Sequence, residues 1–196
     1  MKKFLHTAVA ATVLLLATGA HAAPIASTTD ASLQNATVIN FESMADSSAL
    51  SYDAGVVTFK SLTGSPLSIM FHNGPFGSTG QTLNNTFGNA FEAVFDGTVS
   101  AFGITSGAVN VPWTYTAYGV NNNILEVLSL NDSCCSGFFH GIKADGIKRV
   151  TFTPSSTDWV VFDDIRFSAT QVPEPGSLAL LGLTLAAFAA SRRKKA

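Results

Sequence analysis

Between residues 37 and 169 the sequence is a succession of short apolar segments separated by clusters of Gly, Asn, Ser and Asp. The segments, among them TVINFE, GVVTFKS, AFEAVFD and WTYTAYGV, are rich in Val, Ile, Phe, Thr and Tyr. Their length and composition are typical of β-strands, and the clusters between them are typical of turns. No part of this region predicts the long helices that a parallel α/β sheet needs between its strands. We therefore predict an all-β fold, an antiparallel β-sandwich of jelly-roll type with a phenylalanine-rich core between its sheets.

The residues on either side of this region set the expected domain borders. Residues 23–36 (APIASTTDASLQNA) are small and polar without periodicity, and we interpret them as a linker before a sandwich domain over residues 37–169. Residues 23–172 contain five basic and twelve acidic side chains, a formal charge of −7, whereas the whole chain carries −2. This acidic domain lacks the clustered Lys and Arg that phosphate backbones require, so nucleic-acid binding is excluded as a function.

The first 22 residues have the organisation of a secretory signal peptide. Lys2 and Lys3 precede an apolar run over residues 8–17, and an A-x-A sequence ends at Ala22. Signal peptidase would then cut between Ala22 and Ala23 after the Sec translocon has engaged the N-terminal signal helix. The sequence thus predicts export across the inner membrane.

A second apolar run lies at the other end of the chain. Leu178–Ala190 contains no charged residue, and a basic cluster follows it, formed by Arg192, Arg193, Lys194 and Lys195. A basic cluster of this kind stays on the cytoplasmic side of a membrane. Thirteen residues at about 1.5 Å each reach about 20 Å, less than the roughly 30 Å of a hydrocarbon core. We predict a short transmembrane helix that anchors the protein transiently.

The residues in front of this run carry a resemblance to a known sorting signal. Its motif consists of Val172, Pro173, Glu174 and Pro175. With the apolar run and the basic cluster in this order, residues 170–196 resemble the PEP-CTERM sorting signal of Gram-negative bacteria. The resemblance implies that an exosortase cleaves near the motif and releases the protein to the cell surface or the medium, often among exopolysaccharide. A plain C-terminal membrane anchor is the alternative interpretation.

The last predicted strand, WVVFDDIRF, contains two adjacent acids. Strict alternation places Asp163 on the same face as Ile165 and Phe167, so its carboxylate would be partly buried and need hydrogen bonds or a metal. The chain's first and last strands also resemble those of jelly-roll modules similar to galactose-binding-like and carbohydrate-binding domains. That resemblance implies a structural calcium at Glu42 and Asp163, with Asp46 or Asp164 as further matches, and carboxylate oxygens suit this ion. Hydrogen bonds from backbone amides to Asp163 are the alternative.

Cys134 and Cys135 are the only cysteines of the chain, and they are adjacent. An exported protein normally pairs its cysteines, but neighbouring residues can do so only through a small strained ring. The flanking Ser, Asp and Gly predict a turn that could accept such a disulfide. Two free thiols and bridges to another chain remain as alternatives.

The residues leave three functions open. No catalytic or zinc motif is present, so we predict a non-catalytic exported protein associated with the cell surface or the extracellular matrix. A carbohydrate-binding module that engages exopolysaccharide is the alternative, and a glycan hydrolase with two carboxylates from separate strands is a third. Four aromatic side chains could form a glycan platform, although core packing is the preferred interpretation for each of them: Trp113, Tyr115, Tyr118 and Trp159.

Overall fold

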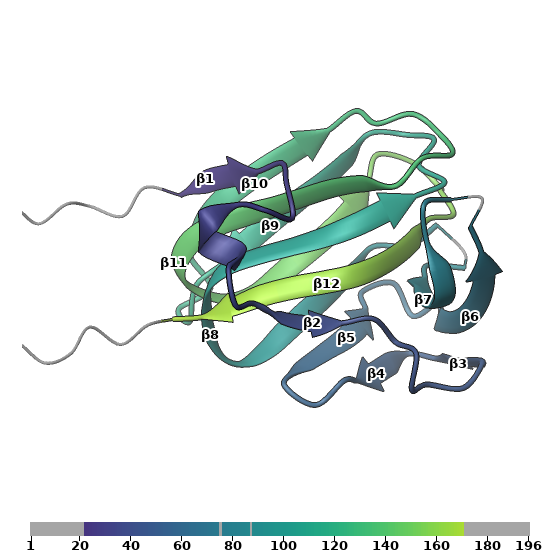
Figure 1. Cartoon of the computed structure of the whole chain (residues 1–196), viewed down its shortest axis with the longest axis horizontal. Helices are drawn as coiled ribbons and strands as arrows, with labels where there is room; N and C mark the ends of the chain where they lie inside the picture. The colour runs from purple at the N-terminus through teal and green to yellow at the C-terminus, as the bar shows by residue number, and fades with distance from the viewer. Residues whose placement is uncertain (1–21, 75, 87, 171–196) are drawn as a thin grey trace, which may run out of the picture.

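A computed structural model describes residues 22–74, 76–86 and 88–170 of the chain (Figure 1). Its elements are β1 (Ala23–Ile25), the 3-10 helix η1 (Ala31–Leu33), β2 (Thr37–Ile39), β3 (Ser47–Ala49), β4 (Ser51–Asp53), β5 (Val57–Ser61), β6 (Leu67–Asn73), β7 (Thr79–Asn84), β8 (Phe91–Gly107), β9 (Trp113–Tyr118), β10 (Ile124–Leu130), β11 (Phe138–Pro154) and β12 (Val161–Ala169). All strand pairs are antiparallel. The predicted all-β fold is confirmed.

Two long strands make the sandwich. β8 and β11, with 17 residues each, pair with one another in both of their halves, and their register shifts between Lys143 and Arg149. The first half of β8 pairs with β5, and its second half pairs with β12. The two strands therefore turn a corner and contribute to two layers. One layer holds β4, β5, β9 and β10, and the other holds β1, β2, β12, β7, β6 and β3.

The core between the layers is rich in phenylalanine, as predicted. Phe91 and Phe152 stack with ring centroids 4.5 Å apart, and Tyr115 meets Phe152 edge-on at 4.7 Å. Phe162 from β12 packs against Phe91 at 4.9 Å. Each such ring removes a large apolar area from water, a contribution of about 2 kcal/mol or more per side chain. These rings come from both layers, so their packing holds the sandwich together.

The predicted linker over residues 23–36 is wrong, because this segment is folded onto the sandwich. β1 pairs with β11, and Ile25 and Leu33 are buried in a small second cluster with Ala101. The Asp30 carboxylate accepts a hydrogen bond from the backbone N–H of Ser32 at 2.8 Å and so caps η1. Two isolated apolar residues give no periodicity, which is why the sequence pattern does not reveal this docking.

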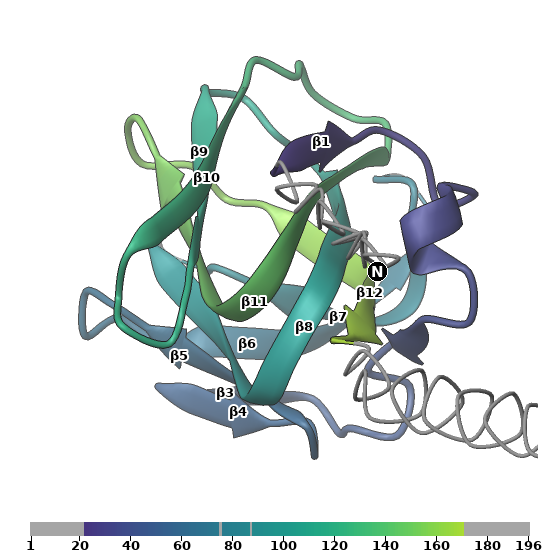
Figure 2. The same ribbon diagram turned by 90° about the vertical axis from the view of Figure 1, so that its left-hand side faces the viewer.

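Both ends of the described chain lie at one end of the sandwich (Figures 1 and 2). Ala23 is opposite Lys143, Lys143 is opposite Ala101, and Ala101 is opposite Ser168. These residues form a row across four neighbouring strands, which spans about 14 Å at 4.8 Å per strand. The β6–β7 hairpin lies at the opposite end (Figure 1). The predicted signal helix and transmembrane helix fall outside the described residues, and no helix within residues 22–74, 76–86 and 88–170 has the length and apolarity to cross a membrane.

Candidate functional site

Asp163 lies at a β-bulge in β12. The register of β12 with β8 shifts between Asp163 and Arg166, and Asp164 has a φ of 48°. Phe162 and Ile165 both belong to the main core cluster although three positions separate them. The predicted strict alternation is therefore wrong at this point, because the bulge adds one residue to the strand. Asp163 does not share the core face of Ile165.

The carboxylate of Asp163 is nevertheless buried, with 8% of the residue exposed. It accepts hydrogen bonds from the Ser78 hydroxyl and from the backbone N–H of Asp164, the latter at 2.8 Å. Burial raises the pKa of Asp163 to about 6, with the charges of Asp164 and Glu42 adding to the rise, and the two hydrogen bonds only partly oppose it. Among the described residues, no lysine, arginine or histidine forms a salt bridge with this carboxylate.

Glu42, the other predicted calcium ligand, lies in the loop between β2 and β3. Its carboxylate rests against Gly80 of β7, where φ is 108° and any Cβ would collide with the carboxylate oxygens. Glu42 is close enough to raise the pKa of Asp163 by charge repulsion. Two carboxylates that approach one another suit a hard ion such as calcium. Within the described part of the chain, no three His, Cys, Asp or Glu side chains cluster as a metal site, so backbone and hydroxyl oxygens would have to complete a shell.

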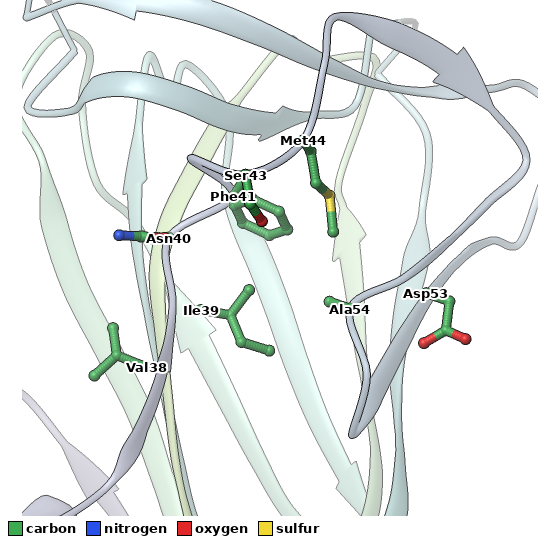
Figure 3. A pocket seen from close by; sticks show the side chains of 8 residues that line it. All are labelled: Val38, Ile39, Asn40, Phe41, Ser43, Met44, Asp53 and Ala54. Atoms are coloured by element: carbon green, nitrogen blue, oxygen red, sulfur yellow. The ribbon is translucent and has the colours of Figure 1, made fainter.

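A hollow of about 330 Å³ lies between the end of β4 and the segment formed by β2 and the loop after it (Figure 3). Its lining residues are Val38, Ile39, Asn40, Phe41, Ser43, Met44, Asp53 and Ala54. The Asp53 carboxylate already accepts the backbone N–H of Gly55 at 2.9 Å, and Phe41 is part of the core. Figure 3 shows Asp53 at the rim, turned away from the aromatic ring of Phe41. Figure 3 also shows the Asn40 amide and the Asp53 carboxylate on opposite sides of the hollow, so these two polar groups do not converge on one point.

Two of the four candidate platform aromatics are core residues. Trp113 and Tyr115 are 2% and 1% exposed, so the predicted platform cannot include them. Burial also raises the pKa of Tyr115 far above its usual value. The ring of Tyr118 is covered by the guanidinium of Arg149, whose Cζ lies 3.7 Å from the ring centroid. Only Trp159 keeps an uncovered, partly exposed indole among the four.

Trp159 belongs to a partly exposed group of rings, which we call the aromatic triad. Its centroid lies 5.3 Å from Phe76 and 5.6 Å from His72, and these two rings lie 5.9 Å apart. The His72 imidazole Nε2 bonds the side-chain oxygen of Asn84 at 3.1 Å, which fixes the ring. The sequence analysis missed the triad because Trp159 lies more than 80 residues from the β6–β7 hairpin that carries His72 and Phe76.

Cys134 and Cys135 form a disulfide with each other in the loop between β10 and β11. Their Cα atoms are 3.7 Å apart, and Cys135 has a φ of 88°. Both residues are exposed. At the base of the loop the His140 Nε2 and the Asp132 carboxylate are 2.7 Å apart. Of the three states left open by the sequence, the structure contains the bond between neighbours.

A second buried carboxylate, Asp158, is a feature that sequence analysis did not single out. It accepts hydrogen bonds from the indole N–H of Trp113 at 2.9 Å, from the backbone N–H of Asn110 at 3.0 Å and from the Asn110 side-chain amide at 3.2 Å. The backbone N–H of Val111 approaches it at 3.4 Å. We call this set the Asp158 network, and it fixes the loop before β9. Its partners are more than 40 residues away in sequence, so no local motif marks it.

The remaining predicted site residues concern processing. Ala22 is partly buried and Ala23 begins β1, so the predicted signal cleavage site lies at the edge of the folded domain. The sorting motif and the basic cluster fall outside the described residues: Val172, Pro173, Glu174, Pro175, Arg192, Arg193, Lys194 and Lys195.

Comparison with known families identifies a PEP-CTERM protein-sorting motif over residues 171–194. The predicted sorting signal is confirmed, and it indicates export with transient membrane anchoring through the C-terminal region. Comparison with curated proteins gives no match.

Two solved structures are among those that comparison finds similar to this chain. One is the enzymatically active domain of tailspike protein 4 from bacteriophage CBA120, 12% identical over 63% of this chain and 19% of that chain, with a TM-score of 0.31. The other is a family 11 carbohydrate-binding module from Clostridium thermocellum in complex with a β-1,3-1,4-mixed-linked tetrasaccharide. It is 13% identical over 69% of this chain and 96% of that chain, with a TM-score of 0.34. Similarity at this level assigns no activity to this chain.

Proposed function

We propose that the chain is an exported, exosortase-processed and non-catalytic protein of the cell surface or the extracellular matrix. The observation that carries the proposal is the PEP-CTERM sorting motif over residues 171–194. In this scheme the Sec translocon exports the chain, signal peptidase removes residues 1–22, and an exosortase cuts near the Pro-Glu-Pro sequence. The folded domain then leaves the inner membrane.

The positions of the chain ends support this route. The backbone N–H of Thr170 bonds the carbonyl of Thr98 at 3.2 Å, so the sandwich extends to the start of the sorting motif. Thr170 and Leu178 are eight residues apart in sequence, a span of at most about 29 Å. An anchored domain would therefore remain close to the membrane, with the β6–β7 end directed away from it. Ligand contact is expected at that outer end.

Intact mass tests the processing. We expect protein from the host medium to lack residues 1–22 and everything beyond the Pro-Glu-Pro region. Replacement of Pro173, Glu174 and Pro175 by Ala should leave the chain membrane-bound with its basic cluster present, while the control Ser177→Ala should be released. A mass in the medium that retains Arg192–Lys195 would contradict exosortase processing.

A second candidate function is glycan binding at the aromatic triad. Trp159 and Phe76 present partly exposed rings at the outer end of the sandwich, and His72 supplies a polar edge beside them. Aromatic faces pack against the apolar faces of sugar rings, and the nearby imidazole can bond hydroxyl groups. The acidic domain favours neutral over acidic polysaccharide because like charges repel.

Affinity electrophoresis in gels that contain the host's exopolysaccharide tests this candidate. We expect Trp159→Ala to weaken binding at least about tenfold, since a central aromatic contributes over 1 kcal/mol. The matched control is Phe71→Ala, because Phe71 is an aromatic residue on β6 that is 61% exposed and outside the triad. If the polysaccharide gel retards both variants as strongly as it retards the unaltered protein, the triad is not the binding site.

We also propose that calcium binds between Glu42 and Asp163. The support is the proximity of the two carboxylates and the raised pKa of Asp163. A divalent cation would offset the repulsion between the carboxylates and lower that pKa. A bound ion would join the loop after β2 to β12. Its role would be structural, because neither carboxylate lies in a deep cleft.

Thermal unfolding of the full-length chain in mild detergent tests the calcium proposal. We expect calcium at about 1 mM to raise Tm by about 3 °C, in the affinity range of extracellular modules. Glu42→Gln and Asp163→Asn should each abolish the rise, whereas Asp145→Asn, an exposed acid at the opposite end, should retain it. A rise that survives both carboxylate replacements would exclude this site.

A further inference from the structure

We propose that the Cys134–Cys135 disulfide is a reversible redox modification site whose state controls the turn between β6 and β7, of which the structure describes Gly74 and residues 76–78. The inference does not depend on glycan binding, although both concern the same end of the sandwich. It follows from three observations: the exposure of the bond, the backbone of Cys135, and a close contact between two loops.

The bond is accessible to a reductant. Cys134, Cys135 and both flanking serines are exposed, and the loop leaves the sheet after Leu130 and rejoins it at Phe138. An exposed disulfide between residues whose Cα atoms are 3.7 Å apart, below the usual range, is of the labile kind. A dithiol reductant attacks one sulfur through its thiolate, and its second thiol then resolves the mixed disulfide. The protein gains two electrons and two protons as two thiols, and the reductant becomes a disulfide.

Reduction removes the constraint that holds the Cys135 backbone. A φ of 88° is unfavourable for a residue with a Cβ and persists only where the surroundings impose it. Once the sulfurs separate, Cys135 is free to return to negative φ. The change displaces the residues that follow it, Ser136 and Gly137. The hydrogen bond between Asp132 and His140 holds the base of the loop, so the displacement is concentrated at its tip.

The tip touches the loop over residues 74–78. A Cβ placed on Gly77 would collide with the backbone of Gly137, so the two backbones are in direct contact. Gly77 also has a φ of 74°, and its neighbour Phe76 carries one ring of the aromatic triad. Movement of Gly137 therefore loosens Gly77, and with it the contact of Phe76 with Trp159. The disulfide and the aromatic triad are thus linked through one backbone contact.

Hydrogen exchange of the full-length chain in mild detergent, before and after treatment with dithiothreitol, tests the proposal. Thiol counting verifies the reduction. We expect amide exchange to accelerate at least about tenfold in residues 131–137 and also in residues 74–78, as for local opening of a loop. The β8–β11 pairing should be unchanged, the emission of Trp159 should shift, and reoxidation should restore both signals. The variant with Cys134→Ser and Cys135→Ser should behave as the reduced protein does.

Gly77→Ala provides the matched test of the link. This variant should exchange rapidly over residues 74–78 in both redox states, because its Cβ already separates the loops. The control Gly64→Ala has a similar φ of 79° but no atom within 4 Å of the added Cβ, and it should respond to reduction as the unaltered protein does. The proposal is overturned if reduction accelerates exchange in residues 131–137 alone, or in neither loop. Loss of the β8–β11 protection on reduction would also overturn it, since the bond would then serve global stability.

Discussion

Asp158 and Asp163 are five residues apart, and both are almost inaccessible, with 4% and 8% of each residue exposed. Asp158 accepts its hydrogen bonds from N–H groups of Asn110, Val111 and Trp113. Asp163 has one hydroxyl and one N–H as donors and faces the charges of two other carboxylates. Equal burial therefore has two different consequences. The number of donors and the sign of the neighbouring charges decide whether a buried acid stabilises a loop or is available for a cation.

The largest expected effect is that of Asp158→Asn. The amide keeps one acceptor oxygen but points an NH2 group at donors, which leaves buried N–H groups unpaired. We expect a loss of about 3 kcal/mol in the free energy of unfolding, measured by urea titration of the full-length chain in mild detergent. A loss below about 1 kcal/mol would mean that water satisfies the Asp158 network.

Trp113→Phe tests one donor of the same network. The ring remains apolar, but the indole N–H that bonds Asp158 at 2.9 Å is lost and a small void forms. We expect about 2 kcal/mol of destabilisation, less than for the aspartate itself. An effect equal to that of Asp158→Asn would instead mean that this one hydrogen bond accounts for all the stabilisation that the Asp158 network provides.

The pH dependence of stability separates the two acids. The pKa of Asp163 is about 6 in the folded chain and about 4 in an unfolded one, so the folded state binds more protons between these values. The contribution of Asp163 to stability is therefore present below about pH 4 and is lost as the pH rises through 6. Asp163→Asn should match the unaltered protein near pH 4 and exceed it by about 1 kcal/mol above pH 6, after allowance for solvent screening.

Urea titrations of both proteins across this pH range, with calcium removed by chelation, provide the measurement. A constant difference at all pH values would show that Asp163 does not titrate in this window. A difference of the opposite sign above pH 6 would show that the carboxylate has a cationic partner.

The smallest effect is expected for Ser78→Ala. Its hydroxyl donates to the Asp163 carboxylate and lowers the pKa of that group, so its removal should raise the pKa further above 6. NMR titration of the Asp163 carboxyl carbon measures the change, and Ser133→Ala in the exposed cysteine loop is the control. An unchanged midpoint would mean that the bond is not formed in solution.

Features encoded in local pattern could be read from the sequence, and those built from distant residues could not. The alternation of β-forming and turn-forming residues predicted the all-β sandwich, and contiguous residues predicted the sorting motif that family comparison confirms. The bulge in β12 was missed because one additional residue moves the side chains that follow it to the opposite face of the strand without altering the composition. The Asp158 network and the aromatic triad were missed because each joins loops that only the fold brings together.

The row formed by Ala23, Lys143, Ala101 and Ser168 has a consequence beyond export. Because the two ends of the domain are about 14 Å apart, the domain can be inserted into another protein with little distortion of that protein's backbone. Residues 23–170 could therefore be spliced as a cassette into a surface turn of an unrelated carrier without stretching either junction. The carrier would then display the outer end of the sandwich away from its own surface.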